Sequence, residues 1–400
     1  MALKHGAVNL GQGFPDFLPE PFVLDAVKDA VDRKLVQYTR SQGHVRLVNA
    51  LGKVYSPLFG KTLDPLSNVV VTVGATEAIY LSFMAFCNPG DEVILIEPFY
   101  DSYPACVNLA GGKPVFVPLR PSRHPNASTS SASDWQLDMH ELRAAITPKT
   151  KMILVNNPGN IPGKVWTRKE LEHIAKLAIE KDLLVVSDEV YEWMVYANEH
   201  GSHHEGHIRM ATLPGMWDRT ITIGSAGKAF SVTGFKVGWI FADSPLAEVI
   251  QRVHTNVAFS VATPLSEAVA VALEESESRN YFPQLRDMFS KKRAKLLNVL
   301  SESGLNPIAP QGSYFILADT SKIDDSRFLD KQALATGTPG TTRDYQFCRW
   351  LTKDIGVAAI PPSAFYSKQH ANMAANYARF AFCKKDESFD MAHQRFYERL

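Results

Sequence analysis

The sequence is poor in cysteine and has no net charge. Its four cysteines, Cys87, Cys106, Cys348 and Cys383, lie far apart and form no Cys-x-x-Cys pair. This usage excludes a disulfide scaffold and argues against structural zinc, so we expect a reducing compartment. The 42 basic residues balance 42 acidic ones. Nothing in this charge balance indicates nucleic acid or an anionic membrane as a partner.

The sequence also lacks an evident targeting or membrane segment. Residues 1–8 are too short and polar for a signal peptide, and they have no Arg/Ser-rich transit character, so we expect a cytoplasmic protein. Residues 69–87 form the longest apolar stretch, but Glu77 interrupts it and Gly74 separates a β-branched run from a helical one. We therefore predict a strand, a turn and a helix there.

A phosphate-binding P-loop is missing from the most conspicuous stretch, residues 225–239. Its Gly-Lys pair has Thr222 and Ala229 where a P-loop requires glycine and Ser/Thr. Ser225 and Lys228 match the Ser-x-x-Lys motif of penicillin-binding enzymes, but the companion motifs are absent, which leaves that alternative weakly supported. Because Lys228 follows an apolar β-branched run and sits among small residues, we predict a functional lysine rather than a solvated surface one.

Strands and helices alternate through the first two thirds of the chain. The predicted strands are residues 69–73, 93–96, 115–119, 152–155, 183–187, 220–223 and 237–241. Runs that are apolar on both faces belong in a mostly parallel sheet covered by helices, which collects ligands at the carboxyl ends of its strands. We therefore predict an α/β fold with a three-layer large domain. After Pro283 the pattern becomes that of a smaller α+β unit, with a long helix over 284–303, strands near 312–317, 357–360 and 378–382, and a closing helix.

Three strand ends carry candidate site residues. Residues 73–76 turn from a strand into a helix, so Thr76 and backbone N–H groups would offer an anion site, although a plain turn explains them nearly as well. Asp188 and Tyr191 follow the strand over 183–187, where Asp188 is equally acceptable as a helix N-cap. Arg379 alternates with apolar residues in the last strand and needs a carboxylate, internal or from a substrate.

Two polar segments carry less information. The histidine-rich patch over residues 200–207 falls in a glycine-containing polar loop without a rigid element to fix metal geometry, so we predict a solvated loop and no metal site. The serine-rich residues 128–133 are predicted to form a surface loop.

Together these features resemble class I aminotransferases of the pyridoxal-phosphate fold type I superfamily. The motifs that carry the resemblance span nearly the whole chain: NLGQGFPD (9–16), QYTR (37–40), VTVG (71–74), GDEV (90–93), EPFY (97–100), SDEVY (187–191), LPGMW (213–217), PQGSYF (310–315) and IPPSAFY (360–366). Among subfamilies the sequence is most similar to the kynurenine/glutamine aminotransferases, also described as cysteine-S-conjugate β-lyases. The resemblance implies a large domain over 22–283, and a small domain made of 1–21 and 284–400.

The resemblance also implies roles for individual residues. Lys228 would hold pyridoxal 5'-phosphate and shuttle a proton, Asp188 would keep the pyridine nitrogen protonated, and Tyr191 with Asn160 would bind the phenolic oxygen. Ala75, Thr76, Ser225 and Lys236 would bind the phosphate, joined by Tyr38 of a second subunit, while Tyr100 would stack on the ring. Arg379 and the backbone of Gly13 would bind the substrate carboxylate. Tyr103, and Phe259 from the neighbouring subunit, would line the side-chain pocket.

The expected protein is thus a homodimer with shared active sites that moves an amino group from kynurenine, glutamine or a related aromatic or sulfur amino acid to a 2-oxo acid. Two alternatives are β-elimination from cysteine S-conjugates as the main reaction and a cofactor-binding pseudoenzyme. The family motif Asn-Pro-x-Gly-Lys appears here as NIPGK (160–164), with the proline one place late, so we expect the loop at Asn160 to take another path. Most of the N-terminal arm seen in relatives is missing, which predicts a more open pocket.

Overall fold

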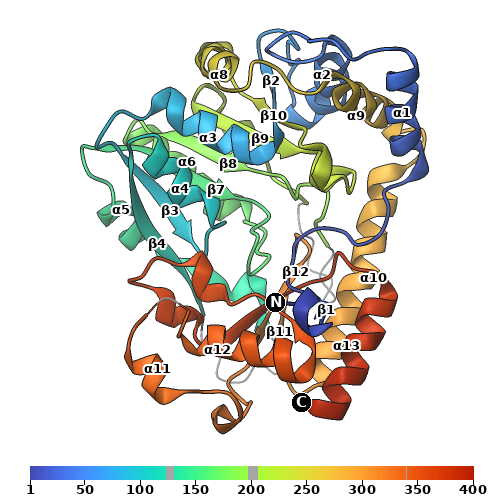
Figure 1. The fold of residues 1–400 in the computed structure, drawn as a ribbon. Coiled ribbons are helices and arrows are strands. Elements are labelled where there is room, and N and C mark those ends of the chain that lie inside the picture. The colour runs from blue at the N-terminus through green and yellow to red at the C-terminus, as the bar shows by residue number, and fades with distance from the viewer. Residues whose placement is uncertain (123–129, 197–205, 339) are drawn as a thin grey trace.

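The computed structural model describes residues 1–122, 130–196, 206–338 and 340–400. Its largest sheet has eight strands in the order β2-β10-β9-β8-β7-β3-β4-β6 (Figure 1). The strands are β2 (Val69–Thr72), β3 (Glu92–Glu97), β4 (Lys113–Pro121), β6 (Trp135–Leu137), β7 (Thr150–Asn156), β8 (Leu184–Asp188), β9 (Thr220–Ser225) and β10 (Gly238–Phe241). The strands β9, β8, β7, β3 and β4 pair in parallel, whereas β10 is antiparallel to both of its neighbours. The seven predicted strands and the mostly parallel sheet are confirmed.

Helices cover this sheet because its strands are apolar on both faces. Every residue of β2, β3, β9 and β10 is buried, as expected for valine- and isoleucine-rich strands between two helical layers. The helices of this part are α1 (Pro21–Asp32), α2 (Val45–Phe59), α3 (Gly74–Phe86), α4 (Ser102–Leu109), α5 (Met139–Ala144), α6 (Arg168–Glu180), α7 (Ala226–Ala229), α8 (Ser244–Val257) and α9 (Thr263–Ser276). Helix α3 packs on β9 and β10, and α4 and α8 pack beside it. Helix α2 packs on β2 and contacts α9.

A second, smaller unit follows as predicted. Its sheet has the order β14-β12-β11-β5, with β5 (Ser130–Ser131), β11 (Asn306–Ala309), β12 (Phe315–Asp319) and β14 (Tyr377–Ala381). Its helices are α10 (Tyr281–Glu302), α11 (Lys331–Ala335), α12 (Arg343–Trp350) and α13 (Asp386–Arg399). Figure 1 shows α10 and α13 side by side along this unit.

Two details of the small unit bear on the sequence predictions. Strand β5 comes from the serine-rich stretch and pairs in parallel with β11 at Ile308 and Ala309, so the surface-loop prediction was wrong at Ser130 and Ser131. That pairing is long-range and leaves no local sequence signal. Strand β1 (Val8–Asn9) pairs in parallel with β13 (Val357–Ala358), which supports the proposal that the first residues belong with the C-terminal unit. The proposed boundary at 283/284 falls in the first turn of α10.

The apolar segment over residues 69–87 is a buried strand followed by helix α3, as its Gly74 and Glu77 indicated. Gly74 has φ +74, a left-handed conformation that glycine adopts without steric cost, and this turn redirects the chain from strand to helix. Within the part of the chain that the structure describes, no helix is both long and apolar enough to span a membrane.

Candidate active site

A cavity of about 420 Å³ lies where the carboxyl ends of β8 and β9 and the start of α3 meet β12 and β14. It collects most of the predicted site residues. Those that line it are Gly13, Ala75, Thr76, Tyr100, Tyr103, Asn160, Asp188, Tyr191, Ser225, Lys228, Lys236 and Arg379. Parallel strands end at one edge of a sheet, so residues far apart in the sequence converge here.

Lys228 lies in the short helix α7, directly after β9, and its amine is enclosed by the cavity wall. Its Nζ donates to Tyr314 Oη at 2.5 Å and lies 3.4 Å from the carbonyl oxygen of Gly13. Burial lowers the pKa of Lys228 to about 8, and the positive charges of Arg379 and Lys236 act in the same direction. About a tenth of the amine is therefore neutral at pH 7, far more than for a lysine with the ordinary pKa, and a nucleophile or base requires the neutral form.

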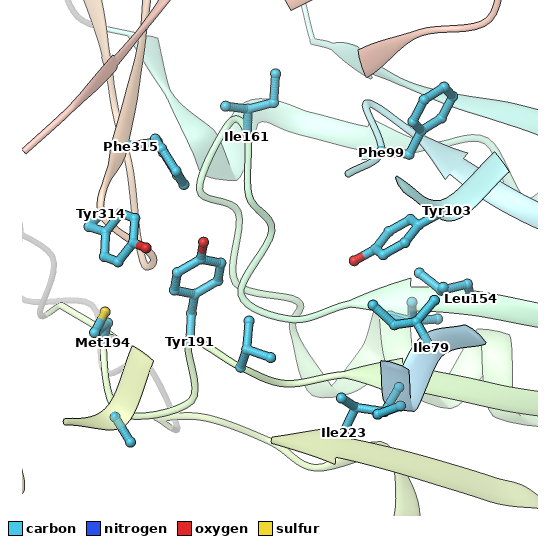
Figure 2. Close-up of a cluster of buried hydrophobic side chains, with 14 of the residues drawn as sticks. Ile79, Phe99, Tyr103, Leu154, Ile161, Tyr191, Met194, Ile223, Tyr314 and Phe315 are labelled. Atoms are coloured by element: carbon cyan, nitrogen blue, oxygen red, sulfur yellow. The ribbon is translucent and has the colours of Figure 1, made fainter. Parts of the chain in front are cut away.

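Asp188 ends strand β8 and faces Lys228 across the cavity. Its carboxylate accepts hydrogen bonds from the Tyr103 hydroxyl and, at 3.3 Å, from the backbone N–H of Val190. Burial raises the pKa of Asp188 to about 6, while the hydrogen bond from Tyr103 and the positive charge of Lys228 oppose the rise. Figure 2 shows Tyr191 and Tyr314 next to each other, with Tyr103 across the view beyond the loop that carries Ile161. Tyr103, predicted for the side-chain pocket, thus lies against Asp188.

The start of helix α3 forms an anion cradle. Lys236 has φ +54, which turns its side chain back toward Gly74. A Cβ placed on Gly74 would lie only 3.2 Å from Lys236 Nζ, so the ammonium rests against the first turn of the helix. Thr76 and Ser225 line the cavity at the same end. Backbone N–H groups at a helix N-terminus, two hydroxyls and an ammonium are the donor set that a phosphate requires.

Arg379, on β14, is a buried cation that forms no ion pair with a carboxylate among the described residues. Its Nη1 donates to Asn160 Oδ1 at 2.8 Å and its Nη2 to the Gly11 carbonyl at 3.2 Å. The guanidinium lies between the rings of Phe315 and Phe365, at 4.1 and 4.6 Å from their centroids. Its Nε is buried with no partner among the described residues. Burial lowers the pKa of Arg379 to about 10, and a ligand carboxylate in the cavity would stabilise its charged form.

The loop with the displaced proline still delivers Asn160 to the cavity. The backbone N–H of Asn160 donates to Asn156 Oδ1 at 2.8 Å, and Asn156 in turn donates to the Asp188 carbonyl at 2.9 Å. The cis bonds of this loop precede Pro158 and Pro162, so neither lies between Asn160 and Ile161. Because its amide oxygen is used by Arg379, Asn160 has its amide nitrogen left for a ligand.

Tyr38 and Phe259 are the predicted residues that do not line the cavity of their own chain. Their rings touch edge to face with centroids 5.1 Å apart. The side chains are 86% and 45% exposed. The sequence analysis assigned both residues to the site of a neighbouring subunit. Such residues must be exposed on the surface of a single chain, as these two are.

Some residues of the site escaped the sequence analysis. Tyr314 contacts Lys228 but was named only as part of the motif over 310–315. Asn156 links Asn160 to β8 but lies just after the predicted strand over 152–155. Residues 200–205 of the histidine-rich patch lie outside the described residues. His207 is the one histidine of the patch among the described residues. Its Nε2 lies 2.7 Å from Glu189 Oε2, and both side chains are buried. His207 is thus an internal partner of Glu189 rather than part of a solvated loop.

The residues present fit pyridoxal 5'-phosphate. The cradle at Gly74 and Lys236 matches its phosphate, Asp188 its ring nitrogen, Lys228 its aldehyde and the orphaned Nε of Arg379 a substrate carboxylate. A mostly parallel sheet domain that combines these groups in one cavity is typical of pyridoxal-phosphate enzymes, the class to which aminotransferases belong.

Comparison with known proteins agrees. The family model for aminotransferase class I and II matches residues 5–396, and the chain belongs to this family. A kynurenine--oxoglutarate transaminase of Dictyostelium discoideum is 47% identical over 400 residues, 98% of this chain and 91% of the relative. Human kynurenine--oxoglutarate transaminase 1 is 41% identical over 99% of this chain and 93% of its own length. A solved putative kynurenine aminotransferase from Saccharomyces cerevisiae superposes with a TM-score of 0.92 at 35% identity, covering 100% and 94% of the two chains.

Proposed function

We propose that this aminotransferase uses pyridoxal 5'-phosphate to move the amino group of kynurenine, glutamine or a related aromatic or sulfur amino acid to a 2-oxo acid. The observation that carries the proposal is the convergence of Lys228, Asp188 and Arg379 on one cavity. Each supplies one requirement of the reaction: a base with a lowered pKa, a carboxylate for the cofactor ring and a cation for the substrate.

The cofactor, when bound, supplies an aldehyde that condenses with amines and a pyridinium ring that takes up the electrons left as the α-proton departs. The chain holds it at both ends. Thr76, Ser225, Lys236 and the N–H groups of Ala75 and Thr76 would bind the phosphate, and Tyr100 would cover one face of the ring. Tyr191 and the Asn160 amide would donate to its phenolic oxygen.

The chain's own groups then orient the substrate and move the proton. Arg379 binds the substrate carboxylate together with the backbone at Gly13, which fixes the α-carbon relative to Lys228. The neutral Lys228 amine takes the α-proton and returns it to the cofactor side. Ionised Asp188 would keep the ring nitrogen protonated. The protonated ring favours loss of the α-proton from the substrate.

The wall of the cavity supports an aromatic or long neutral substrate side chain. Phe14, Phe315, Ile360 and Phe365 line it. The three cationic side chains that line it, Lys228, Lys236 and Arg379, already have roles in this proposal. Among the described residues of the wall, no further cation is left for a distal carboxylate of a substrate. The names of the relatives, kynurenine transaminases, point to the same class of substrate.

The active unit is a homodimer in this proposal, because Tyr38 and Phe259 are exposed here and would complete the cavity of a second copy. A cytoplasmic location stays a prediction, supported by cysteines that are all free.

Absorbance spectroscopy of the purified protein with pyridoxal phosphate tests the proposal. We expect a visible band of the lysine-linked cofactor, and its loss when kynurenine, glutamine or methionine is added without a 2-oxo acid. Lys228→Ala should lack the lysine-linked band. Persistence of that band in the variant would show that the lysine is misassigned, and a wild-type band that no amino acid discharges would contradict the proposed function.

A further inference from the structure

Tyr314 has a contact with Lys228 that none of the roles above uses. Its hydroxyl donates to the Gly13 carbonyl at 2.6 Å and lies 2.5 Å from Lys228 Nζ. Lys228 Nζ lies 3.4 Å from the same carbonyl oxygen. The three groups come from distant parts of the sequence and form one closed triangle beside the cavity.

The chemistry of the triangle fixes the direction of its hydrogen bonds. A carbonyl oxygen only accepts, and a tyrosine hydroxyl has a single hydrogen, which here goes to Gly13. The hydroxyl oxygen therefore accepts from Lys228. Burial raises the pKa of Tyr314 well above its ordinary value, so the phenol keeps its proton throughout the working pH range.

This direction determines how a neutral Lys228 amine is oriented. A neutral amine has two hydrogens and one lone pair, and the triangle takes up the hydrogens with Tyr314 and Gly13. This leaves the lone pair on the side of the nitrogen away from Tyr314 and Gly13. We propose that Tyr314 is a positioning residue, which holds the hydrogens of Lys228 against Gly13 so that its lone pair faces the substrate. The proposal rests on the role of Lys228 in the proposed function.

The packing contacts of Tyr314 are made by its aromatic ring and do not require its hydroxyl. That ring contacts Tyr191 and Phe315, with centroids 5.1 and 4.8 Å apart, and is 1% exposed. Phenylalanine preserves these contacts and removes only the hydroxyl. The hydroxyl is therefore separable from the ring by a single substitution.

Tyr196 offers a matched control, because its hydroxyl binds the residue that precedes Tyr314. It is also 1% exposed, and its hydroxyl donates to the carbonyl of Ser313 at 2.6 Å, next to Tyr314. Tyr196 is not among the residues that line the cavity. Tyr196→Phe thus removes an equally buried hydroxyl that binds next to Tyr314 and has no hydrogen bond to Lys228.

Two measurements on Tyr314→Phe and Tyr196→Phe test the proposal. The first is the single-turnover rate at which a saturating amino acid discharges the bound cofactor. We expect Tyr314→Phe to slow this step about ten- to a hundredfold, with a nearly unchanged half-saturating concentration, and Tyr196→Phe to stay within about twofold of wild type.

The second measurement uses cofactor-free protein and follows the pKa of Lys228 through the pH dependence of its modification by an amine reagent. The pKa should fall in Tyr314→Phe, because the ammonium loses an acceptor, and should not move in Tyr196→Phe. If either readout is the same in the two variants, the positioning role is wrong. If wild type itself converts no amino acid, the proposed function fails instead, and the titration of Lys228 still reports on the triangle.

Discussion

The hydroxyl of Tyr103, on helix α4, donates a hydrogen bond to the carboxylate of Asp188 at the end of β8. Asp188 is buried in the cavity wall, where desolvation raises its pKa to about 6. The hydrogen bond stabilises the ionised form and limits this rise. Tyr103 therefore supports the acid that we propose to face the cofactor ring, whereas the family resemblance implied a place in the side-chain pocket.

Replacing Tyr103 by phenylalanine should weaken cofactor binding. Without the hydrogen bond the pKa of Asp188 rises further, so more of the carboxyl is protonated near neutral pH and cannot pair with a protonated ring nitrogen. We expect the dissociation constant for pyridoxal phosphate to increase about tenfold at pH 7, from a hydrogen bond to a charged group worth roughly 1.5 kcal/mol. Spectral titration measures it, with Tyr196→Phe as control. A loss that does not shrink as the pH is raised would contradict the explanation.

The pH dependence of cofactor capture should report the lowered pKa of Lys228. Only the neutral amine attacks the aldehyde, so the rate of reconstitution should rise with pH and level off above a pKa of about 8. A lysine with the ordinary value, 10.5, would give a rate that still climbs above pH 9. Stopped-flow absorbance of cofactor-free protein mixed with pyridoxal phosphate between pH 6 and pH 10 separates the two cases.

The sequence predicted which residues line this site, but it did not predict which of them contact one another. Lys228, Asp188 and Arg379 each follow or occupy a strand, and the alternation of strands and helices predicted that such ends would converge. The triangle of Gly13, Tyr314 and Lys228 could not be anticipated, because its members are brought together by two sheets whose relative placement no local pattern encodes. The pairing of Ser130 with Ile308 was missed for the same reason.

Arg379→Lys should impair substrate binding while leaving the cofactor in place. A lysine keeps the charge but lacks the planar fork of donors with which the guanidinium can bind a carboxylate while it also donates to Asn160 and Gly11. We expect kcat/KM for the amino acid to fall by about two orders of magnitude, mainly through KM. Steady-state kinetics and cofactor titration on the same variant check this. If the variant binds the cofactor more weakly and its KM for the amino acid is unchanged, Arg379 binds the cofactor and not the substrate.

His207→Ala should destabilise the fold rather than change the chemistry. His207 and Arg209 face the buried Glu189, which follows Asp188 in the sequence. Although burial alone would raise the pKa of Glu189, these partners bring it below its usual range. Removing one partner of a buried charge costs about 3 kcal/mol or more. Urea unfolding measures this cost, with the exposed His173→Ala as control; equal stability of the two variants would show that the Glu189 pair contributes nothing.

Mixed dimers should reveal whether Tyr38 serves the neighbouring subunit. Tyr38 is exposed in its own chain and in contact with Phe259, so Tyr38→Ala should damage the site of the partner rather than its own. We mix Tyr38→Ala with Lys228→Ala subunits, unfold them together and refold them. Each mixed dimer then contains one site with both residues intact and one with neither. If sites are shared, the mixture regains about a quarter of wild-type activity although both parent variants are impaired, since half of the dimers are mixed and half of their sites are whole. Activity no higher than the average of the two parents would place Tyr38 in its own subunit's site and remove the main argument for a shared one.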